Sequence, residues 1–117
     1  MDAKQAALEE KLANLLKQAA EVGAEIQAVE QGPGVPHYDQ IESHAHQCGQ
    51  RLSQMLQETR VAEITAGQPP EALCPDCAKG GRTKTKSRRL LSGDGPVELI
   101  ENVAHCTRCR RDFFPSA

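Results

Sequence analysis

Four of the five cysteines form two closely spaced pairs in the C-terminal part of the chain. The pairs are Cys74-x-x-Cys77 and Cys106-x-x-Cys109, and 28 residues separate them. Two residues between cysteines allow a tight turn to direct both sulfur atoms toward one ion, and two such turns supply a tetrahedral set of four thiolates. Such a set favours Zn²⁺, although iron also accepts four thiolates. We predict a structural zinc site formed by these four cysteines.

The surroundings of the cysteines favour a metal over redox chemistry. Two thioredoxin-like motifs are the alternative, but the βαβ context of such motifs is missing. The chain opens with a polar segment and contains no signal-like or membrane-spanning apolar run. We therefore expect a cytoplasmic, reducing compartment and no membrane partner, so that paired cysteines bind metal. The position after each pair often holds glycine because it needs a positive φ, yet here Ala78 and Arg110 occupy it.

Basic side chains are concentrated around the cysteine pairs. Residues 1–73 carry 5 Lys/Arg and 11 Asp/Glu, whereas residues 74–117 carry 9 Lys/Arg and 5 Asp/Glu. Such a charge asymmetry indicates a nucleic-acid-binding end on an acidic body. The nine candidate DNA contacts are Lys79, Arg82, Lys84, Lys86, Arg88, Arg89, Arg108, Arg110 and Arg111.

Four of these cations have the spacing of one face of a β-strand. Arg82, Lys84, Lys86 and Arg88 alternate with two threonines and a serine, so that side chains on the same face repeat at roughly 6.5 Å. Successive phosphates of one DNA strand have a comparable spacing, so the row could follow a backbone while the hydroxyls donate hydrogen bonds. Because no aromatic residue is interleaved, we do not expect base stacking. The alternative is a solvated charge run that protects an exposed strand edge.

The remaining ionisable side chains do not indicate catalysis. His44, His46 and Cys48 resemble a ligand cluster, but on a helix only His44 and Cys48 share a face, and Cys48 falls on an apolar seam. We expect a buried thiol with two surface histidines there. His105 adjoins Cys106 and is interpreted as a strand residue beside a complete ligand set. Because four cysteines leave zinc no open position for water, we expect no enzymatic activity and no small-molecule substrate.

The segment between the cysteine pairs predicts the β-hairpin that would bring them together. RTKTKSRRLL alternates in character, SGDG is typical of a turn, and PVELIENVAH is β-branched and alternating. Two metal-binding turns joined by a small antiparallel sheet constitute a zinc ribbon. Because this short module holds the chain's two phenylalanines as its only aromatic residues, we expect the metal to stabilise its fold.

Two helices with apolar seams are predicted before this module. Residues 3–30 carry apolar side chains at alternating spacings of four and three, and residues 38–66 repeat the pattern after the helix-breaking QGPGVP segment. The seams allow an antiparallel pair within the chain, or pairing with a second copy or a partner helix. We therefore predict an α+β fold with an N-terminal antiparallel helical hairpin or coiled coil (1–66), a linker (67–73) and a small four-cysteine zinc-ribbon β-hairpin module (74–117).

Several motifs occur between residue 38 and residue 115. They comprise Gly49-x-x-Leu52, the Cys-Pro-x-Cys pair that begins at Cys74, an L-L-G-x-V motif at 90–97 with a Ser-Gly-Asp insertion, and the closing CTRCRRDFFP at 106–115. This set resembles the N-terminal region of ISKra-type insertion-sequence transposases. The first helix, 1–30, is not covered by the resemblance.

The resemblance implies a DNA-binding region in which the zinc module helps to grip transposon ends. In that family the region precedes a catalytic domain with acidic, metal-binding residues, whereas this chain ends at Ala117. We accordingly predict a non-catalytic, zinc-stabilised DNA-binding module that lacks the catalytic domain, as an excised fragment, a truncated copy or a stand-alone protein. The alternative is a protein-interaction adaptor that uses the helical seams, with the zinc ribbon as a structural platform.

Overall fold

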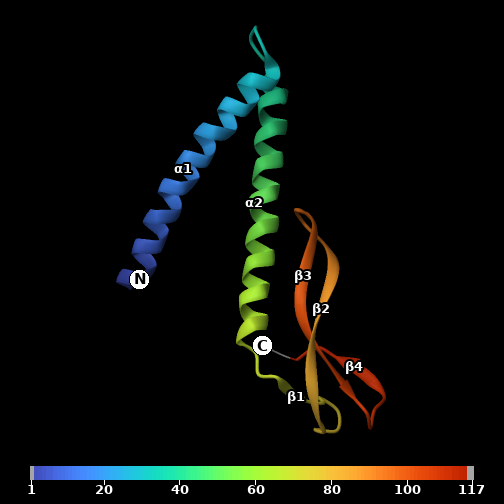
Figure 1. Cartoon of the computed structure of the whole chain (residues 1–117). Helices are drawn as coiled ribbons and strands as arrows, with labels where there is room; N and C mark the ends of the chain where they lie inside the picture. The colour runs from blue at the N-terminus through green and yellow to red at the C-terminus, as the bar shows by residue number, and fades with distance from the viewer. Residues whose placement is uncertain (1, 116–117) are drawn as a thin grey trace. The chain divides into compact units, whose positions relative to one another are not determined.

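A computed structural model describes residues 2–115 and shows two helices followed by a four-stranded antiparallel sheet (Figure 1). Helix α1 spans Ala3–Gln31 and α2 spans Tyr38–Gly67. The strands, which are neighbours in chain order, are β1 (Glu71–Leu73), β2 (Gly80–Ser92), β3 (Gly95–Cys106) and β4 (Arg111–Phe113). The predicted α+β class is therefore confirmed. No helix in the described range combines the length and the apolar character that a membrane crossing requires.

The chain divides into two compact units, one up to Gly49 and the other from Gln50 onward. The second half of α2 thus belongs to the same unit as the sheet, although the predicted boundary followed the end of this helix. The predicted linker at 67–73 is also partly wrong, because residues 71–73 form β1 and pair with the first residues of β2. A strand of three residues is too short for an alternating pattern to be recognised.

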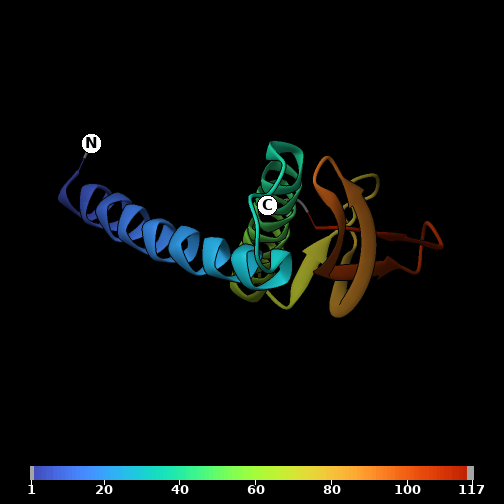
Figure 2. The ribbon, with the colours of Figure 1, turned by 90° about the horizontal axis from the view of Figure 1, so that it is seen from above.

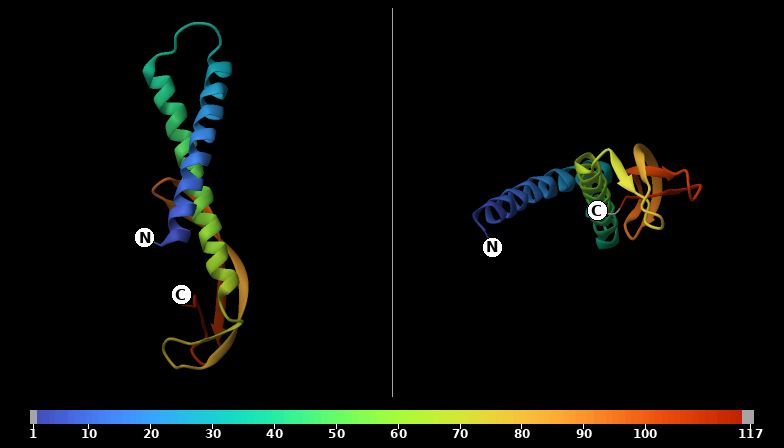
Figure 3. Two further views of the ribbon diagram at one scale, coloured as in Figure 1. Left: turned by 90° about the vertical axis from the view of Figure 1, so that its left-hand side faces the viewer. Right: turned by 90° about the horizontal axis from the view of Figure 1, so that it is seen from below.

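In the first unit, side-chain and backbone caps define the ends of α1. The Oδ1 of Asp2 accepts a hydrogen bond of 2.7 Å from the backbone N–H of Gln5, which satisfies one of the unpaired N–H groups of the first turn. At the other end Gly32 adopts a φ of 75°, and its N–H donates to the carbonyl of Ala28 at 3.1 Å. The chain then turns back through a short loop into the start of α2 (Figure 3).

The contact between α1 and the first part of α2 is narrow and polar. The Nε2 of His44 lies 2.9 Å from the carbonyl oxygen of Gly23, and the Sγ of Cys48 lies 3.8 Å from the same nitrogen. A Cβ atom at Gly23 would lie 3.9 Å from the Sγ of Cys48, an ordinary contact distance. The prediction of a buried Cys48 and a surface His44 is therefore wrong: the thiol is exposed and the histidine is half-buried.

The apolar seam of α1 takes no part in this contact. The half-buried residues of α1 are Gly23, Gln27 and Gln31, which lie beside the seam on the helix surface. The seam side chains are between 47% and 82% exposed: Leu8, Leu12, Leu15, Val22, Ile26 and Val29. Within the described residues of the first unit, this seam therefore has no packing partner.

In the second unit, β2 and β3 form the predicted hairpin, whose twist is visible in Figure 2. The two strands pair from Thr83 opposite Ala104 to Ser92 opposite Gly95. Gly95 has a φ of 106°, and a Cβ atom there would lie 2.7 Å from the side-chain nitrogen of Gln54. The turn thus needs glycine for its backbone conformation, and the side chain of Gln54 would have to shift to accommodate a Cβ atom there.

The second half of α2 covers the outer edge of β3 with polar side chains. The carboxylate of Glu58 accepts a hydrogen bond of 2.8 Å from the N–H of Glu98, and the hydroxyl of Thr65 donates to the carbonyl of Ile100 at 2.6 Å. Strand β4 pairs with β3 only at Ala104–Cys106, so it does not reach these groups. The helix therefore satisfies backbone groups that would otherwise form an open strand edge.

The same helix half also contacts the tip and the base of the hairpin. At the tip, the hydroxyl of Ser53 donates to the carboxylate of Asp94 at 2.6 Å, and the amide of Gln54 donates to the backbone carbonyl of Asp94 at 2.8 Å. At the base, the amide of the buried Asn102 donates to the carbonyl of Thr65 at 3.0 Å. The hydrogen bonds of this interface join polar side chains, which a search for apolar seams does not detect.

The apolar core of the second unit is small. Within residues 2–115, the buried apolar side chains are Cys74, Val97, Leu99, Ala104 and Cys106. Two of them belong to the cysteine pairs, so the core and the candidate metal site share residues. Because little apolar surface is removed from water, burial alone provides only modest stability.

Candidate metal centre

Each cysteine pair lies in a tight turn between two paired strands. Cys74 directly follows β1 and its turn leads into β2, whereas Cys106 is the last residue of β3 and its turn leads into β4. Strand β1 pairs with the start of β2, and β4 pairs with the end of β3. Because β2 and β3 pair with each other, the sheet brings the two turns together at the end of the hairpin opposite its tip.

Both turns close with the same backbone hydrogen bond. The N–H of Ala78 donates to the carbonyl of Cys74 at 2.9 Å, and the N–H of Arg110 donates to the carbonyl of Cys106 at 2.7 Å. The φ angles are 63° at Ala78 and 56° at Arg110, which confirms that the position after each pair needs a left-handed backbone. No other non-glycine residue in the described part of the chain has a positive φ.

This backbone conformation is unfavourable for residues with a side chain. A left-handed conformation costs roughly 1–2 kcal/mol at a residue other than glycine. Strained conformations of this kind persist where the surrounding structure determines them, and they concentrate at ligand-binding sites. Strain at both cysteine turns is therefore typical of a ligand-binding site.

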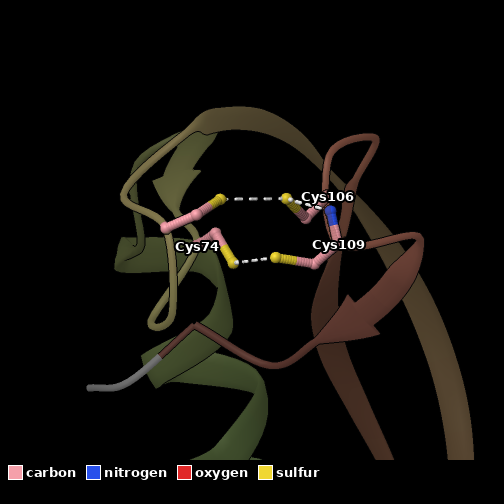
Figure 4. Close-up of side chains that lie close together, drawn as sticks. Cys74, Cys106 and Cys109 are labelled. Carbon is pink, nitrogen blue, oxygen red and sulfur yellow. Dashed lines mark hydrogen bonds between the residues drawn. The ribbon is translucent and has the colours of Figure 1, made fainter.

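The four sulfur atoms form one cluster, in which sulfurs of the first turn face those of the second (Figure 4). All four lie within 4.8 Å of one another. The Sγ atoms of Cys74 and Cys109 are 3.8 Å apart, and those of Cys77 and Cys106 are 3.4 Å apart. A tetrahedral zinc site with Zn–S bonds of about 2.3 Å would place its sulfurs about 3.8 Å apart. The predicted ligand set is thus a cluster that could hold a metal ion.

The protein surroundings shift the pKa values of two thiols of the second turn in opposite directions. The backbone N–H of Cys109 donates to the Sγ of Cys106 at 3.3 Å, and this hydrogen bond is the main reason why the pKa of Cys106 is lowered to about 6. The pKa of Cys109 is raised to about 12, first by the side-chain hydrogen bond with Cys77 and then by burial. A divalent cation would favour ionisation of all four thiols, since thiolates are the ligands.

His105 lies next to the cluster but outside it. Its side chain is exposed on β3, and its Nδ1 is 2.8 Å from a carboxylate oxygen of Asp112 on β4. Among residues 2–115, the four cysteines are the one group of three or more potential metal ligands. The interpretation of His105 as a strand residue is confirmed.

The nine predicted DNA contacts are all exposed, but they differ in their neighbours. Arg88 forms an ion pair of 2.7 Å with Glu101, and its guanidinium lies 5.2 Å from the centre of the Phe114 ring. Its charge is therefore partly compensated within the chain. This aromatic contact also places the segment after β4 near the middle of β2.

Two of the nine cations connect the two cysteine-bearing turns. Arg111, after the second turn, forms an ion pair with Asp76 in the first turn. Lys79, after the first turn, donates to the hydroxyl of Thr107 in the second turn. These contacts support the cysteine cluster, and the sequence gives no signal for them because their partners are 28 and 35 residues away.

The other six cations have no acidic partner in the described residues. They are Arg82, Lys84, Lys86, Arg89, Arg108 and Arg110. Strand β1 pairs with β2 only as far as Arg82, so that no described strand covers the outer edge of β2 from Lys84 onward. We call the residues from Arg82 to Arg89 the basic strand segment.

Polar residues of α2 and β3 that connect the helix to the sheet were missed by sequence reasoning. Glu58, Thr65 and Asn102 are not part of any motif. In the sequence each appears only as a polar residue within a helix or strand, with no sign of the backbone or side-chain groups that it contacts.

Comparison of the chain with models of known protein families, with curated proteins and with solved structures finds no match.

Proposed function

We propose that this chain is a non-catalytic, zinc-stabilised module that binds DNA through its phosphate backbone. The observation that carries the proposal is the basic strand segment of β2. Its outer edge is not covered by another described strand, and it lies next to a cluster of four cysteines. The proposed metal is Zn²⁺ and the proposed fold of the cysteine-bearing part is a zinc ribbon. In this arrangement the metal has a structural role, because four thiolates leave it no position for water or substrate.

Zinc is supported by the geometry and by the composition of the core. The sulfur separations of 3.4 and 3.8 Å are close to those of a tetrahedral thiolate site. Iron accepts the same ligands, but nothing else in the described residues indicates electron transfer. Because two of the buried apolar residues are themselves ligands, metal binding would supply much of the folding free energy of this unit.

DNA binding is supported by the alternation of side chains along β2. Arg82, Lys84 and Lys86 project from one face of the strand at roughly 6.5 Å intervals, and none has an acidic partner in residues 2–115. Glu101 lies opposite Lys86 in the register but pairs with Arg88. A row of this kind fits phosphate contacts, which position a protein on DNA without reading its sequence.

The motifs that resemble the N-terminal region of ISKra-type transposases support the same function. The resemblance suggests transposon DNA as the target and catalysis in a domain other than this one. The proposal for this chain is therefore binding without catalysis. The proposed cytoplasmic location follows from the absence of a signal-like segment in the sequence.

A salt titration of duplex binding tests the phosphate contacts. The zinc-loaded chain should bind a short duplex with an affinity that falls as salt rises, since each phosphate contact releases counterions. The double substitution Lys84→Gln/Lys86→Gln should weaken binding equally on unrelated sequences and reduce the slope of log K against log salt by about 1.8. The matched control is Lys4→Gln/Lys17→Gln on α1, which removes the same charge and should leave the slope unchanged.

Three outcomes would contradict the DNA-binding proposal. They are absence of binding at low salt, binding that does not weaken with added salt, and an equal effect of the control on α1. Metal analysis of the purified chain is a separate test of the zinc site. Less than one zinc per chain, or iron in its place, would contradict the metal assignment alone.

A second candidate function is a protein-interaction adaptor, and the exposed seam of α1 favours it. Six apolar side chains along one helix face lack a partner in the described residues. A helix with such a face is expected to bind another helix. Partner binding by the adaptor should persist in the Lys84→Gln/Lys86→Gln variant, whereas the DNA-binding function should be weakened by it.

A further inference from the structure

The seam of α1 is left open by the contacts within the chain. Gly23, Gln27 and Gln31 are the half-buried positions of the helix, and they lie roughly 110° around the helix axis from the centre of the seam. His44 contacts the carbonyl of Gly23 on that side. The intramolecular contact thus uses a different face, and the seam remains accessible to another helix.

The side chains of the seam differ in size in a way that favours one orientation of a second α1 helix. In heptad notation the a positions are Leu12, Ala19 and Ile26, and the d positions include Leu15 and Val22. In an antiparallel pair, a positions face d positions, so that the small Ala19 lies opposite the large Leu15 of the other helix. Leu12 then faces Val22 in the same register. A parallel pair would instead place Ala19 against Ala19 and leave a poorly filled layer.

The charged residues beside the seam favour the same orientation. Lys11 and Glu25 occupy g positions, and in this antiparallel register each faces the other residue on the second helix, which gives two attractive pairs. Leu16 occupies an e position and faces its own copy across the two-fold axis. In a parallel pair, by contrast, Lys11 would face Leu16, and Glu25 would face Glu30 with like-charge repulsion.

We propose that the exposed seam of α1 is a self-association surface, on which α1 of a second copy packs in antiparallel orientation. The core layers are then Leu8 with Ile26, Leu12 with Val22 and Leu15 with Ala19, each formed twice around the two-fold axis. The pairs between Lys11 and Glu25 flank these layers. The interface is isologous, as in most homodimers, and it is independent of whether the second unit binds DNA.

Charge reversal at one position distinguishes the two orientations. In sedimentation equilibrium of the full zinc-loaded chain, Glu25→Lys should raise the dimer dissociation constant on the order of tenfold, because both attractive pairs become repulsive. A parallel dimer predicts the opposite, since the substituted side chain would then face Glu30. The double variant Lys11→Glu/Glu25→Lys should restore association, because the reversed charges again attract.

The matched control is Glu21→Lys, which makes the same charge change on the helix face away from the seam. It should leave the dissociation constant unchanged, and circular dichroism should show equal helix content in all variants. A chain that stays monomeric at every concentration tested would overturn the proposal. It would also be overturned by tighter association of the Glu25→Lys variant, by a failure of the double variant to restore association, or by an equal loss in the control.

Discussion

The two compact units of this chain differ in whether they contain a buried apolar core. In the first unit the apolar seam of α1 is exposed, with Val29 at 82%, and the contact with α2 is made by a histidine and a glycine carbonyl. In the second unit a small set of apolar side chains is buried, with Val97 at 2% and Ala104 at 1% exposed, although others such as Leu91 remain exposed. The buried set lies next to two cysteines of the cluster, which are themselves buried.

This difference follows from how each kind of element is held together. A helix forms its backbone hydrogen bonds within one segment, so a long helix such as α1 retains structure with little tertiary packing. The sheet pairs residues that are far apart in the sequence, and its small core supplies little free energy. The first unit should therefore tolerate loss of tertiary contacts, whereas the second should depend on the proposed metal.

Loss of the proposed metal should have the largest effect, and this effect should be confined to the second unit. Chelation, or the substitution Cys106→Ser, should remove folding free energy on the order of 10 kcal/mol from the second unit. NMR amide signals of β2 and β3 should then collapse to random-coil positions, while those of α1 persist.

The exposed Cys48 supplies a matched control for this experiment. Cys48→Ser alters a thiol outside the cluster and should leave all amide signals of the sheet in place. Simultaneous loss of α1 and the sheet on chelation would contradict the independence of the two units. Retention of the sheet after chelation would show that the metal does not stabilise the sheet.

Removal of a buried polar contact should have a smaller effect, confined to the second unit. In Asn102→Ala the carbonyl of Thr65 and the side-chain oxygen of Gln68 each lose a donor. We expect a loss of about 1–3 kcal/mol in urea unfolding of the zinc-loaded chain.

Asn14→Ala is the control for this substitution. Asn14 is exposed on α1, and alanine is the better helix former, so this variant should not reduce the stability of the sheet. An Asn102→Ala variant as stable as the control would show that α2 does not depend on this contact.

Glycine substitutions should change stability with opposite sign in the two units. Ala78→Gly relieves the cost of a φ of 63°, so it should stabilise the zinc-loaded second unit by about 0.5–1 kcal/mol, measured as a shift of the urea midpoint. Ala13→Gly places the same residue in the interior of α1 and should lower its helicity, at a cost of about 1 kcal/mol. A destabilising effect of Ala78→Gly would indicate that the turn carries no strain.

Much of this architecture follows from local patterns that the sequence displays directly. Seven seam positions and the QGPGVP breaker predict helices over 3–30 and 38–66, against observed helices of Ala3–Gln31 and Tyr38–Gly67. The spacing of the four cysteines predicts their cluster, because each turn needs only local geometry once the hairpin pairs. The demand for a positive φ at Ala78 and Arg110 is likewise a local property of these turns.

The parts that escaped prediction depend on contacts between distant polar residues. Strand β1 forms because Glu71–Leu73 pairs with β2, and a segment of three residues carries no pattern that predicts this pairing. Glu58 and Thr65 look like surface residues of a helix, yet they bind backbone groups of β3. Arg111 looks like a DNA contact, and its ion pair with Asp76 appears only when the two turns come together.

The helix that covers β3 also determines how the chain would misfold. If α2 detached, the N–H of Glu98 and the carbonyl of Ile100 would lose their partners, and a strand with few charges could be recruited by other molecules into an intermolecular sheet. Strand β2 resists such recruitment through mutual repulsion of its cations. Aggregation of partly unfolded protein should thus begin at the outer edge of β3. By covering this edge, α2 should reduce fibril formation.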